Sequence, residues 1–207
     1  MTIDQLNKQL AQRIPGPMDA TVRYAVLVPL VELEGKLHLL YEVRAATLRR
    51  QPGEVCFPGG RIEKDESAQE CALRETWEEL SISPDAIRVL GPLDFICHRS
   101  GFIMYPILAL VDGQAVKHLI PNPDEVDSTF LVPLSALRSI SPEQYRYELI
   151  PNPGKDFPYE RVGIPRDYCW QSGVESGLIY PWQDKAIWGL TARITRHVLS
   201  LWDEERV

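Results

Sequence analysis

The sequence predicts an α/β or α+β protein with a mixed β-sheet, because two kinds of segment alternate along it. Segments rich in Val, Leu and Ile are typical of buried strands, and segments whose apolar residues recur at helical spacing are typical of amphipathic helices. With 44% hydrophobic and 25% charged residues, the 207-residue chain has the composition of a soluble globular protein. We therefore expect residues 1–207 to form one domain with a substantial core.

The first expected element is a helix over residues 3–14, where apolar residues recur at helical spacing before a Pro-Gly-Pro stop. Residues 24–33 and 37–43 are expected strands, joined by a hairpin turn at residues 34–36. Residues 44–64 form a loop dense in Arg, Gly and Pro.

A central helix is expected from Ser67 to Leu80, with Pro84 just beyond its end. Strand-like runs follow at residues 87–90, 93–98, 103–111 and 129–133. Periodic apolar residues predict a C-terminal amphipathic helix over about 185–202. Residues 150–184 carry many Pro, Gly and aromatic residues, and their pattern supports no assignment.

Charge and cysteine usage argue against several classes of function. The formal net charge of −7 argues against affinity for nucleic acid or an anionic membrane, although a divalent metal would let an acidic chain bind a polyanionic small molecule. No apolar run approaches the roughly 18–20 residues that span a bilayer, and residues 1–13 read as neither signal nor transit peptide. The four cysteines form no CxxC pair, which favours free thiols in a reducing cytoplasm.

The helix from Ser67 to Leu80 carries the candidate chemistry. Glu75, Glu78 and Glu79 share one face at about 100° per residue, and carboxylates so close repel one another unless a cation lies between them. Mg²⁺ and Mn²⁺ prefer such oxygen ligands. Opposite them, an apolar stripe is expected to bury against a sheet, which leaves the acidic face in solvent. This stripe consists of Leu73, Trp77 and Leu80.

A solvated acidic surface is the alternative interpretation of this helix, since charge runs are usually solvated. Two features favour a functional site. Arg74 has the i,i+4 spacing to pair with Glu70 or Glu78 and so to steady the acidic face. The pair Gly59–Gly60 directly precedes the helix, where a backbone without side chains can approach a ligand closely.

This segment resembles the Nudix box, a motif of Gly, five residues, Glu, seven residues and Arg-Glu-aliphatic-x-Glu-Glu-x-Gly-aliphatic, here residues 60–82. Two positions depart from the motif: Thr76 replaces an aliphatic residue and Ser81 replaces the glycine. The matching residues are Gly60, Glu66, Arg74, Glu75, Glu78, Glu79 and Ile82.

The resemblance implies an α/β/α sandwich in which the box forms a loop–helix–loop metal site for Mg²⁺ or Mn²⁺. Glu75 and Glu79 would be the principal metal ligands, and Glu78 would be a further ligand or a base. The Gly60 carbonyl would complete the metal shell, while Glu66 and Arg74 would form a supporting salt bridge. The implied reaction is attack of water on a phosphorus of a nucleoside diphosphate linked to another group.

A second pattern lies immediately upstream and is similar to the additional signature of the coenzyme A diphosphatase subfamily. Tyr41 and Glu42 depart from its opening Leu-Thr. The positions that match are Arg44-Ala45, Arg49, Gly53 and Phe57-Pro58-Gly59-Gly60. Arg44, Arg49, Gly53 and Gly59 are therefore candidates for substrate binding, because coenzyme A carries a diphosphate and a 3′-phosphate that arginines can bind. For Arg50 and Arg61, pairing with the acidic surface is an equal alternative.

Several alternatives stay open at this point. Glu125 is a candidate base or extra metal ligand, although a surface turn explains it equally well. Hydrolysis of ADP-ribose or another nucleoside diphosphate sugar would use the same metal site. A catalytically silent Nudix domain that senses a nucleotide is disfavoured, because it has no need of three repelling carboxylates. The oligomeric state is not fixed by the sequence, and a homodimer is one expectation.

Overall fold

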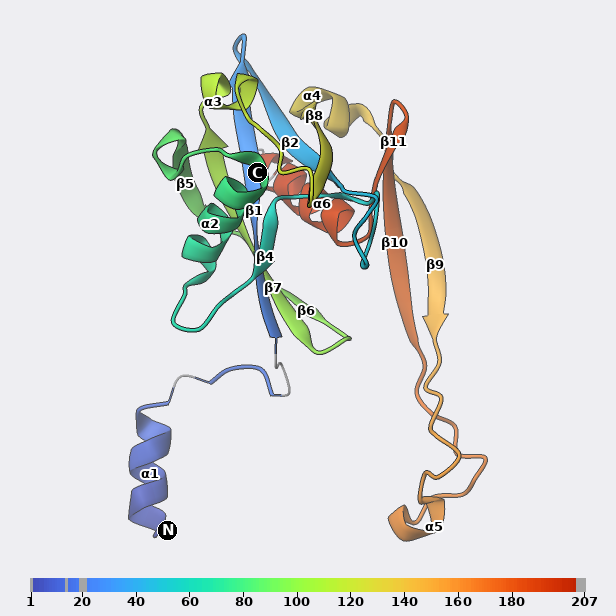
Figure 1. Ribbon diagram of the computed structural model, residues 1–207. Helices are drawn as coiled ribbons and strands as arrows, with labels where there is room; N and C mark the ends of the chain where they lie inside the picture. The colour runs from blue at the N-terminus through green and yellow to red at the C-terminus, as the bar shows by residue number, and fades with distance from the viewer. Residues whose placement is uncertain (1, 14, 19–21, 204–207) are drawn as a thin grey trace.

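A mixed β-sheet forms the centre of the computed structural model, which describes residues 2–13, 15–18 and 22–203 (Figure 1). Its strands follow the order β3-β2-β1-β7-β5, while β4 also pairs with β1, β6 with β7 and β8 with β2. The long strands β1 and β7 are parallel, and β1 and β2 form an antiparallel hairpin. The strands of this sheet are β1 (Val22–Leu33), β2 (Lys36–Arg44), β3 (Val55–Cys56), β4 (Gly59–Arg61), β5 (Ile87–Pro92), β6 (Ile96–His98), β7 (Phe102–Val111) and β8 (Val126–Pro133).

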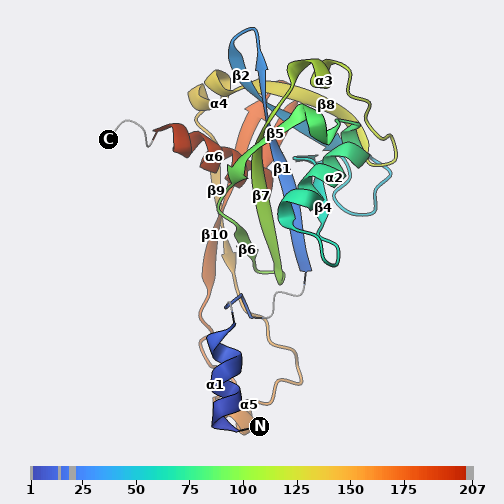
Figure 2. The same cartoon turned by 90° about the vertical axis from the view of Figure 1, so that its left-hand side faces the viewer.

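Helices cover both faces of this sheet, which gives the α/β/α sandwich that the resemblance implies (Figures 1 and 2). On one face, α2 packs against Ala25, Leu27 and Val31 of β1. On the other face, α4 and α6 pack against a core that includes Tyr41, whose hydroxyl lies 2.9 Å from the Thr195 hydroxyl. The helices are α1 (Ile3–Ala11), α2 (Ala68–Leu80), the 3₁₀ helix η1 (Pro84–Ala86), α3 (Gly113–Lys117), α4 (Leu134–Ser139), α5 (Tyr159–Val162) and α6 (Gly189–Asp203).

A second, three-stranded sheet supplies an arm that extends away from the sandwich (Figure 1). It consists of β9 (Glu143–Leu149), β10 (Gly173–Trp182) and β11 (Lys185–Trp188) in the order β11-β10-β9. The end of the arm carries α5 and aromatic residues that contact one another edge to face, such as Phe157 and Trp170. Among the described residues, no helix is both long enough and apolar enough to cross a membrane.

The strand predictions for the central sheet and the helix over Ser67–Leu80 are confirmed within a few residues, and two predictions at the ends of the chain are corrected. The C-terminal helix begins at Gly189 and not near residue 185, because residues 185–188 pair with β10 as the strand β11. The N-terminal helix ends at Ala11, and Ile14 lies outside the described residues.

Strand boundaries inside the sheet also differ. The loop over residues 44–64 contains β3 and β4, two short strands that pair with β2 and β1. The strand predicted over residues 93–98 is regular only from Ile96. Short strands such as these depend on their partners in the sheet, so they leave no periodic pattern of their own in the sequence.

Candidate active site

Helix α2 is fixed at both ends by its own residues. Ser67 caps its start: the Ser67 side chain accepts from the Glu70 N–H at 3.2 Å, and the Glu70 carboxylate accepts from the Ser67 N–H at 2.8 Å. Ser81 ends the helix in the left-handed conformation, φ 55° and ψ 29°, which is the role of the glycine that it replaces. The Glu70 carboxylate therefore caps the helix through Ser67, and the prediction that it could pair with Arg74 is wrong.

The buried side of α2 differs from the predicted stripe. Trp77 is 51% exposed, whereas Thr76 is fully buried and donates its hydroxyl hydrogen to the Ala72 carbonyl at 2.7 Å. The buried residues of α2 are Cys71, Ala72, Thr76, Glu79 and Leu80. The helix is therefore rotated relative to the prediction, and Glu79 faces inward rather than into solvent.

The short strand β4 lies directly under the carboxylates of α2, and its two glycines permit this approach. The Gly59 N–H donates to Glu79 Oε2 at 2.8 Å. A Cβ atom at Gly60 would lie 2.1 Å from Glu75 Oε1, and one at Gly59 would lie 2.3 Å from the Ala25 carbonyl oxygen. No larger residue fits at either position without a shift, which accounts physically for the Gly-Gly pair.

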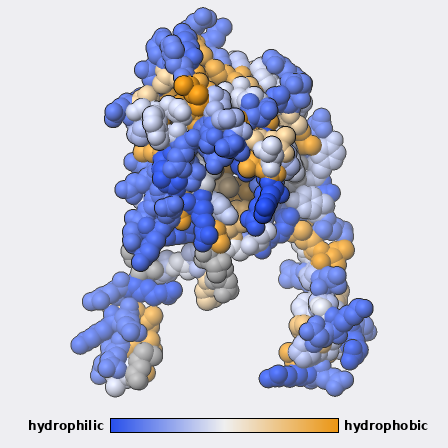
Figure 3. Space-filling view, viewed as in Figure 1, coloured by the Kyte–Doolittle hydropathy of each residue, from blue (hydrophilic) through white to orange (hydrophobic). Residues whose placement is uncertain are grey.

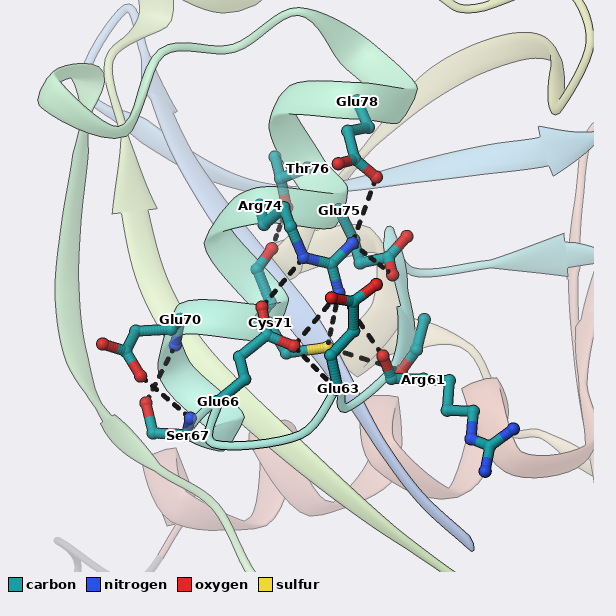
Figure 4. A network of polar contacts seen from close by, with 12 residues as sticks. Arg61, Glu63, Glu66, Ser67, Glu70, Cys71, Arg74, Glu75, Thr76 and Glu78 are labelled. Carbon is teal, nitrogen blue, oxygen red and sulfur yellow. Dashed lines mark hydrogen bonds and ion pairs between the residues drawn. The ribbon is translucent and has the colours of Figure 1, made fainter.

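Arg74 is the centre of an ion-pair network on the outer side of the helix (Figure 4). Its Nε and Nη2 contact the two carboxylate oxygens of Glu66 at 2.8 and 3.1 Å. Its Nη1 contacts Glu75 at 2.8 Å and Glu78 at 3.1 Å. The bidentate pair with Arg74 holds the pKa of Glu66 at about 2. The structure thus contains the Glu66–Arg74 salt bridge that the resemblance implies, and it extends that bridge to two further carboxylates.

A buried acidic cluster lies on the inner side of α2. Burial is the largest cause that raises the pKa of Glu79 to about 9, and the charge of Glu42 is the next. The charges of Glu75 and Glu125 raise the pKa of both Glu79 and Glu42. Burial raises the pKa of Glu42 to about 7, and it also raises that of Glu75. Only 4% of Glu79 and 1% of Glu42 are exposed. Glu42 was not among the residues predicted for the site, although its departure from the upstream signature was the available signal.

Glu125 reaches this cluster through the pairing of β2 with β8. The Ala45 N–H donates to the Glu125 carbonyl at 2.8 Å, and a register shift at Val43/Arg44 ends the regular pairing beside it. Glu125 is half-buried there and lines the same cavity as Glu75 and Glu79. Glu78 differs, because its side chain is 51% exposed and points to Arg74 (Figure 4).

Glu75, Glu79 and Glu125 form part of the wall of a cavity of about 940 Å³. Figure 3 shows a hollow in this face of the molecule, with hydrophilic side chains along its rim. Arg44, Arg50 and Arg61 line the cavity near α2. The lining also comes from the turn after β6, the arm and the start of α6. It includes residues that neither motif contains, namely Arg99, Tyr147, Trp188 and Arg193.

Two of the four predicted substrate-binding residues line this cavity, namely Arg44 and Gly59. Arg49 is exposed and outside the lining, next to Arg50, which is part of it. Gly53 is also outside the lining; its φ of 72° and its N–H donation to the Arg44 carbonyl at 3.0 Å give it a role in the turn that positions Arg44. The second motif therefore contributes to the cavity both directly and through the shape of its loop.

The donor set fits a hard divalent cation. Glu75, Glu79, Glu42 and Glu125 offer oxygen ligands, and within the described residues Glu42 Oε2 is buried without a hydrogen-bond partner. No three Asp, Glu, His or Cys side chains of the described part are already arranged around one point, and one carboxylate oxygen of Glu75 is paired with Arg74.

Comparison with known proteins identifies this arrangement. Residues 21–152 match the family model described as the NUDIX domain, and this range holds β1, β4, α2 and the acidic cluster. The chain belongs to the Nudix family. Its hydrolase class agrees with its relatives, which include Nudix hydrolase 3 of Caenorhabditis elegans, 28% identical over 91% of this chain and 77% of that protein.

Two further relatives are more than 30% identical to this chain, and they differ in how much of their own length is matched. The Nudix hydrolase NudL of Yersinia enterocolitica is 34% identical over 92% of this chain and 87% of that protein. The peroxisomal coenzyme A diphosphatase NUDT7 of Mus musculus is 36% identical over 65% of this chain, but the match spans only 56% of the mouse protein. Among solved structures, an Ap4A hydrolase of C. elegans is similar with a TM-score of 0.46 and 20% identity, over 54% of this chain and 80% of that chain.

Proposed function

We propose that this Nudix hydrolase cleaves the diphosphate linkage of coenzyme A or its derivatives, with Mg²⁺ or Mn²⁺ as cofactor. The observation that carries the proposal is the single cavity that joins the carboxylates of α2 to Arg44 and Gly59 of the upstream signature. The 36% identity to a protein named as a coenzyme A diphosphatase supports the same substrate. Water adds to one phosphorus while the bridging P–O bond breaks, which gives adenosine 3′,5′-bisphosphate and 4′-phosphopantetheine.

Glu75, Glu79 and the Gly60 carbonyl would hold the cation, and Glu78 would join them from the outer side of the helix. The bound cation neutralises charge on the diphosphate and lowers the pKa of the attacking water. Glu125 is our candidate for the base, because it lines the cavity and its carboxylate has no salt-bridge partner among the described residues. Arg74 would position Glu75 and Glu78 through its three ion pairs.

The arginines would divide the phosphates of the substrate between them. Arg44 lies beside the acidic cluster and would bind the diphosphate, whereas the exposed Arg50 and Arg61 also line the cavity and would bind the 3′-phosphate. A site built for that phosphate discriminates against a substrate without it, since an unpaired polar group typically costs about 1–3 kcal/mol. The cytoplasmic location, the single domain over residues 1–207 and the homodimer remain predictions.

The test compares kcat/KM for coenzyme A, dephospho-coenzyme A and ADP-ribose with one metal at one concentration. Coenzyme A should be preferred by tenfold or more over each of the other two. A tenfold preference for ADP-ribose would refute the substrate assignment and leave the Nudix chemistry standing, whereas no hydrolysis of any of the three would favour a nucleotide sensor.

A matched pair of variants locates the 3′-phosphate contact. Arg50→Ala should reduce the preference for coenzyme A over dephospho-coenzyme A, because Arg50 lines the cavity. Arg49→Ala removes the same charge one residue away, outside the lining, and should leave the preference unchanged. Equal effects of the two substitutions would show that the preference reflects only general positive charge.

A further inference from the structure

Glu42 is a buried acidic residue that neither the Nudix box nor the upstream signature supplies. It lies near the end of β2, where side chains alternate between the two faces of the sheet, so Leu40, Glu42 and Arg44 share a face. Leu40 belongs to the core under α2, and Arg44 lines the cavity. Glu42 therefore lies on the α2 side of the sheet, between the core and the candidate active site.

The two carboxylate oxygens of Glu42 have different surroundings. Oε1 accepts a hydrogen bond from the Cys56 thiol at 3.1 Å, across the β2–β3 pair that places these two residues opposite each other. Oε2 is buried and has no hydrogen-bond partner among the described residues, and the same holds for the Nε atom of Arg44. Buried polar atoms are almost always satisfied in native proteins, and a carboxylate oxygen without a partner is costly.

The surroundings of Glu42 indicate which partner the free oxygen would take. Glu42 is the carboxylate with the strongest repulsion on the buried Glu79, ahead of Glu75 and Glu125. The charges of Glu42 and Glu79 both raise the pKa of the Cys56 thiol, and its hydrogen bond is to Glu42. A second carboxylate that faces Glu79 inside the protein lowers the stability of the metal-free fold through charge repulsion. A cation bound between the two carboxylates would turn this repulsion into attraction.

We propose that Glu42 is an additional cation-binding residue, whose Oε2 faces the divalent cation held by Glu79 from the inner side of the site. This proposal rests on the proposed metal-dependent function. Thr is the usual residue of the upstream signature at this position, so this chain supplies one more negative charge to the cation than the signature does. The Cys56 thiol orients the Glu42 carboxylate by holding Oε1, which leaves Oε2 for the cation.

The experiment measures Mn²⁺ binding to the metal-free protein, by isothermal titration and by the electron paramagnetic resonance signal of free Mn²⁺. Glu42→Gln keeps the shape and an oxygen that can accept from Cys56, but it removes the charge. We expect it to weaken Mn²⁺ binding at least tenfold or to remove one bound ion. We also expect its metal-free melting temperature to equal or exceed that of the wild type. Glu63→Gln is the control, since Glu63 is exposed and the substitution changes the net charge equally.

A second variant at the same position controls for a folding defect in Glu42→Gln. Glu42→Thr restores the residue of the signature and should show the same loss of Mn²⁺ affinity. Mn²⁺ binding within twofold of the wild type in a folded Glu42 variant would overturn the inference, as would an equal loss in Glu63→Gln. Absence of Mn²⁺ binding by the wild type would instead overturn the proposed metal-dependent function, and this inference with it.

Discussion

Replacement of Arg74 by alanine tests the ion-pair network on which the outer side of α2 depends. The substitution removes a bidentate pair with Glu66 and the single contacts with Glu75 and Glu78. The shift of the Glu66 pKa from 4.5 to about 2 corresponds to roughly 3 kcal/mol before screening. Because 28% of the Arg74 side chain and 13% of the Glu66 side chain are exposed, we reduce this to about 1–2 kcal/mol.

The expected loss of stability corresponds to a fall in melting temperature of about 2–8 °C for a chain of this length. Its dependence on pH follows from the depressed pKa of Glu66. The stabilisation is complete above about pH 4.5, where the unfolded carboxyl is also ionised, and it is lost as the pH falls toward about 2. Thermal melts of wild type and Arg74→Ala should therefore differ most at neutral pH and converge in acid.

Activity should fall about 10- to 100-fold in Arg74→Ala, because a residue that orients metal ligands typically has an effect of that size. Arg74→Lys keeps the charge but not the planar fork, so its stability should be intermediate. A double-mutant cycle with Glu66→Ala isolates the energy of the pair itself. An unchanged melting temperature with full activity would refute the reasoning and make Arg74 a solvated surface residue.

Three further substitutions have distinct expected outcomes. Glu79→Gln should abolish most turnover. Because the pKa of Glu79 is raised to about 9, the metal-free wild type should lose stability relative to this variant as the pH rises from about 4.5 to 9. Thermal melts across that pH range measure this loss. Gly60→Ala should lower kcat at least tenfold with little change in melting temperature, because the new Cβ meets the movable carboxylate of Glu75. Gly59→Ala should instead lower the melting temperature markedly, because its Cβ meets the Ala25 backbone; equal melting temperatures of the two glycine variants would contradict this distinction.

Local sequence patterns predicted the parts of the fold in which each segment carries its own signal. The long apolar runs of β1 and β7 and the periodic helix after Ser67 are of this kind. The strand β11 was predicted as the first turn of a helix, because Ile187 also fits the helical apolar pattern of α6. Pairing with β10 decides between the two structures, and that partner lies in the stretch for which the sequence supported no assignment.

The candidate site was predicted better in its residues than in its geometry. The motifs placed Glu75 and Glu79 on one face of a helix, but they did not reveal that Glu79 is buried or that Arg49 lies outside the cavity. Hydrophobicity alone assigns Trp77 to the core and a glutamate to solvent. The sheet reverses both assignments, because contact with Gly59 requires Glu79 to face inward.

The burial of Glu79 and the exposure of Trp77 follow together from the geometry of α2. They indicate that the orientation of the helix favours the candidate site over packing of the core. Trp77 and Glu79 are two positions apart, about 200° around the helix, so burying one exposes the other. Burying Trp77 would be worth more to the stability of the fold than burying a carboxylate with a pKa near 9. The structure instead buries Glu79 beside Glu42 and leaves Trp77 51% exposed. A helix that served only packing would have the opposite orientation, and a cation bound between the inner carboxylates would restore part of the stability lost in the metal-free protein.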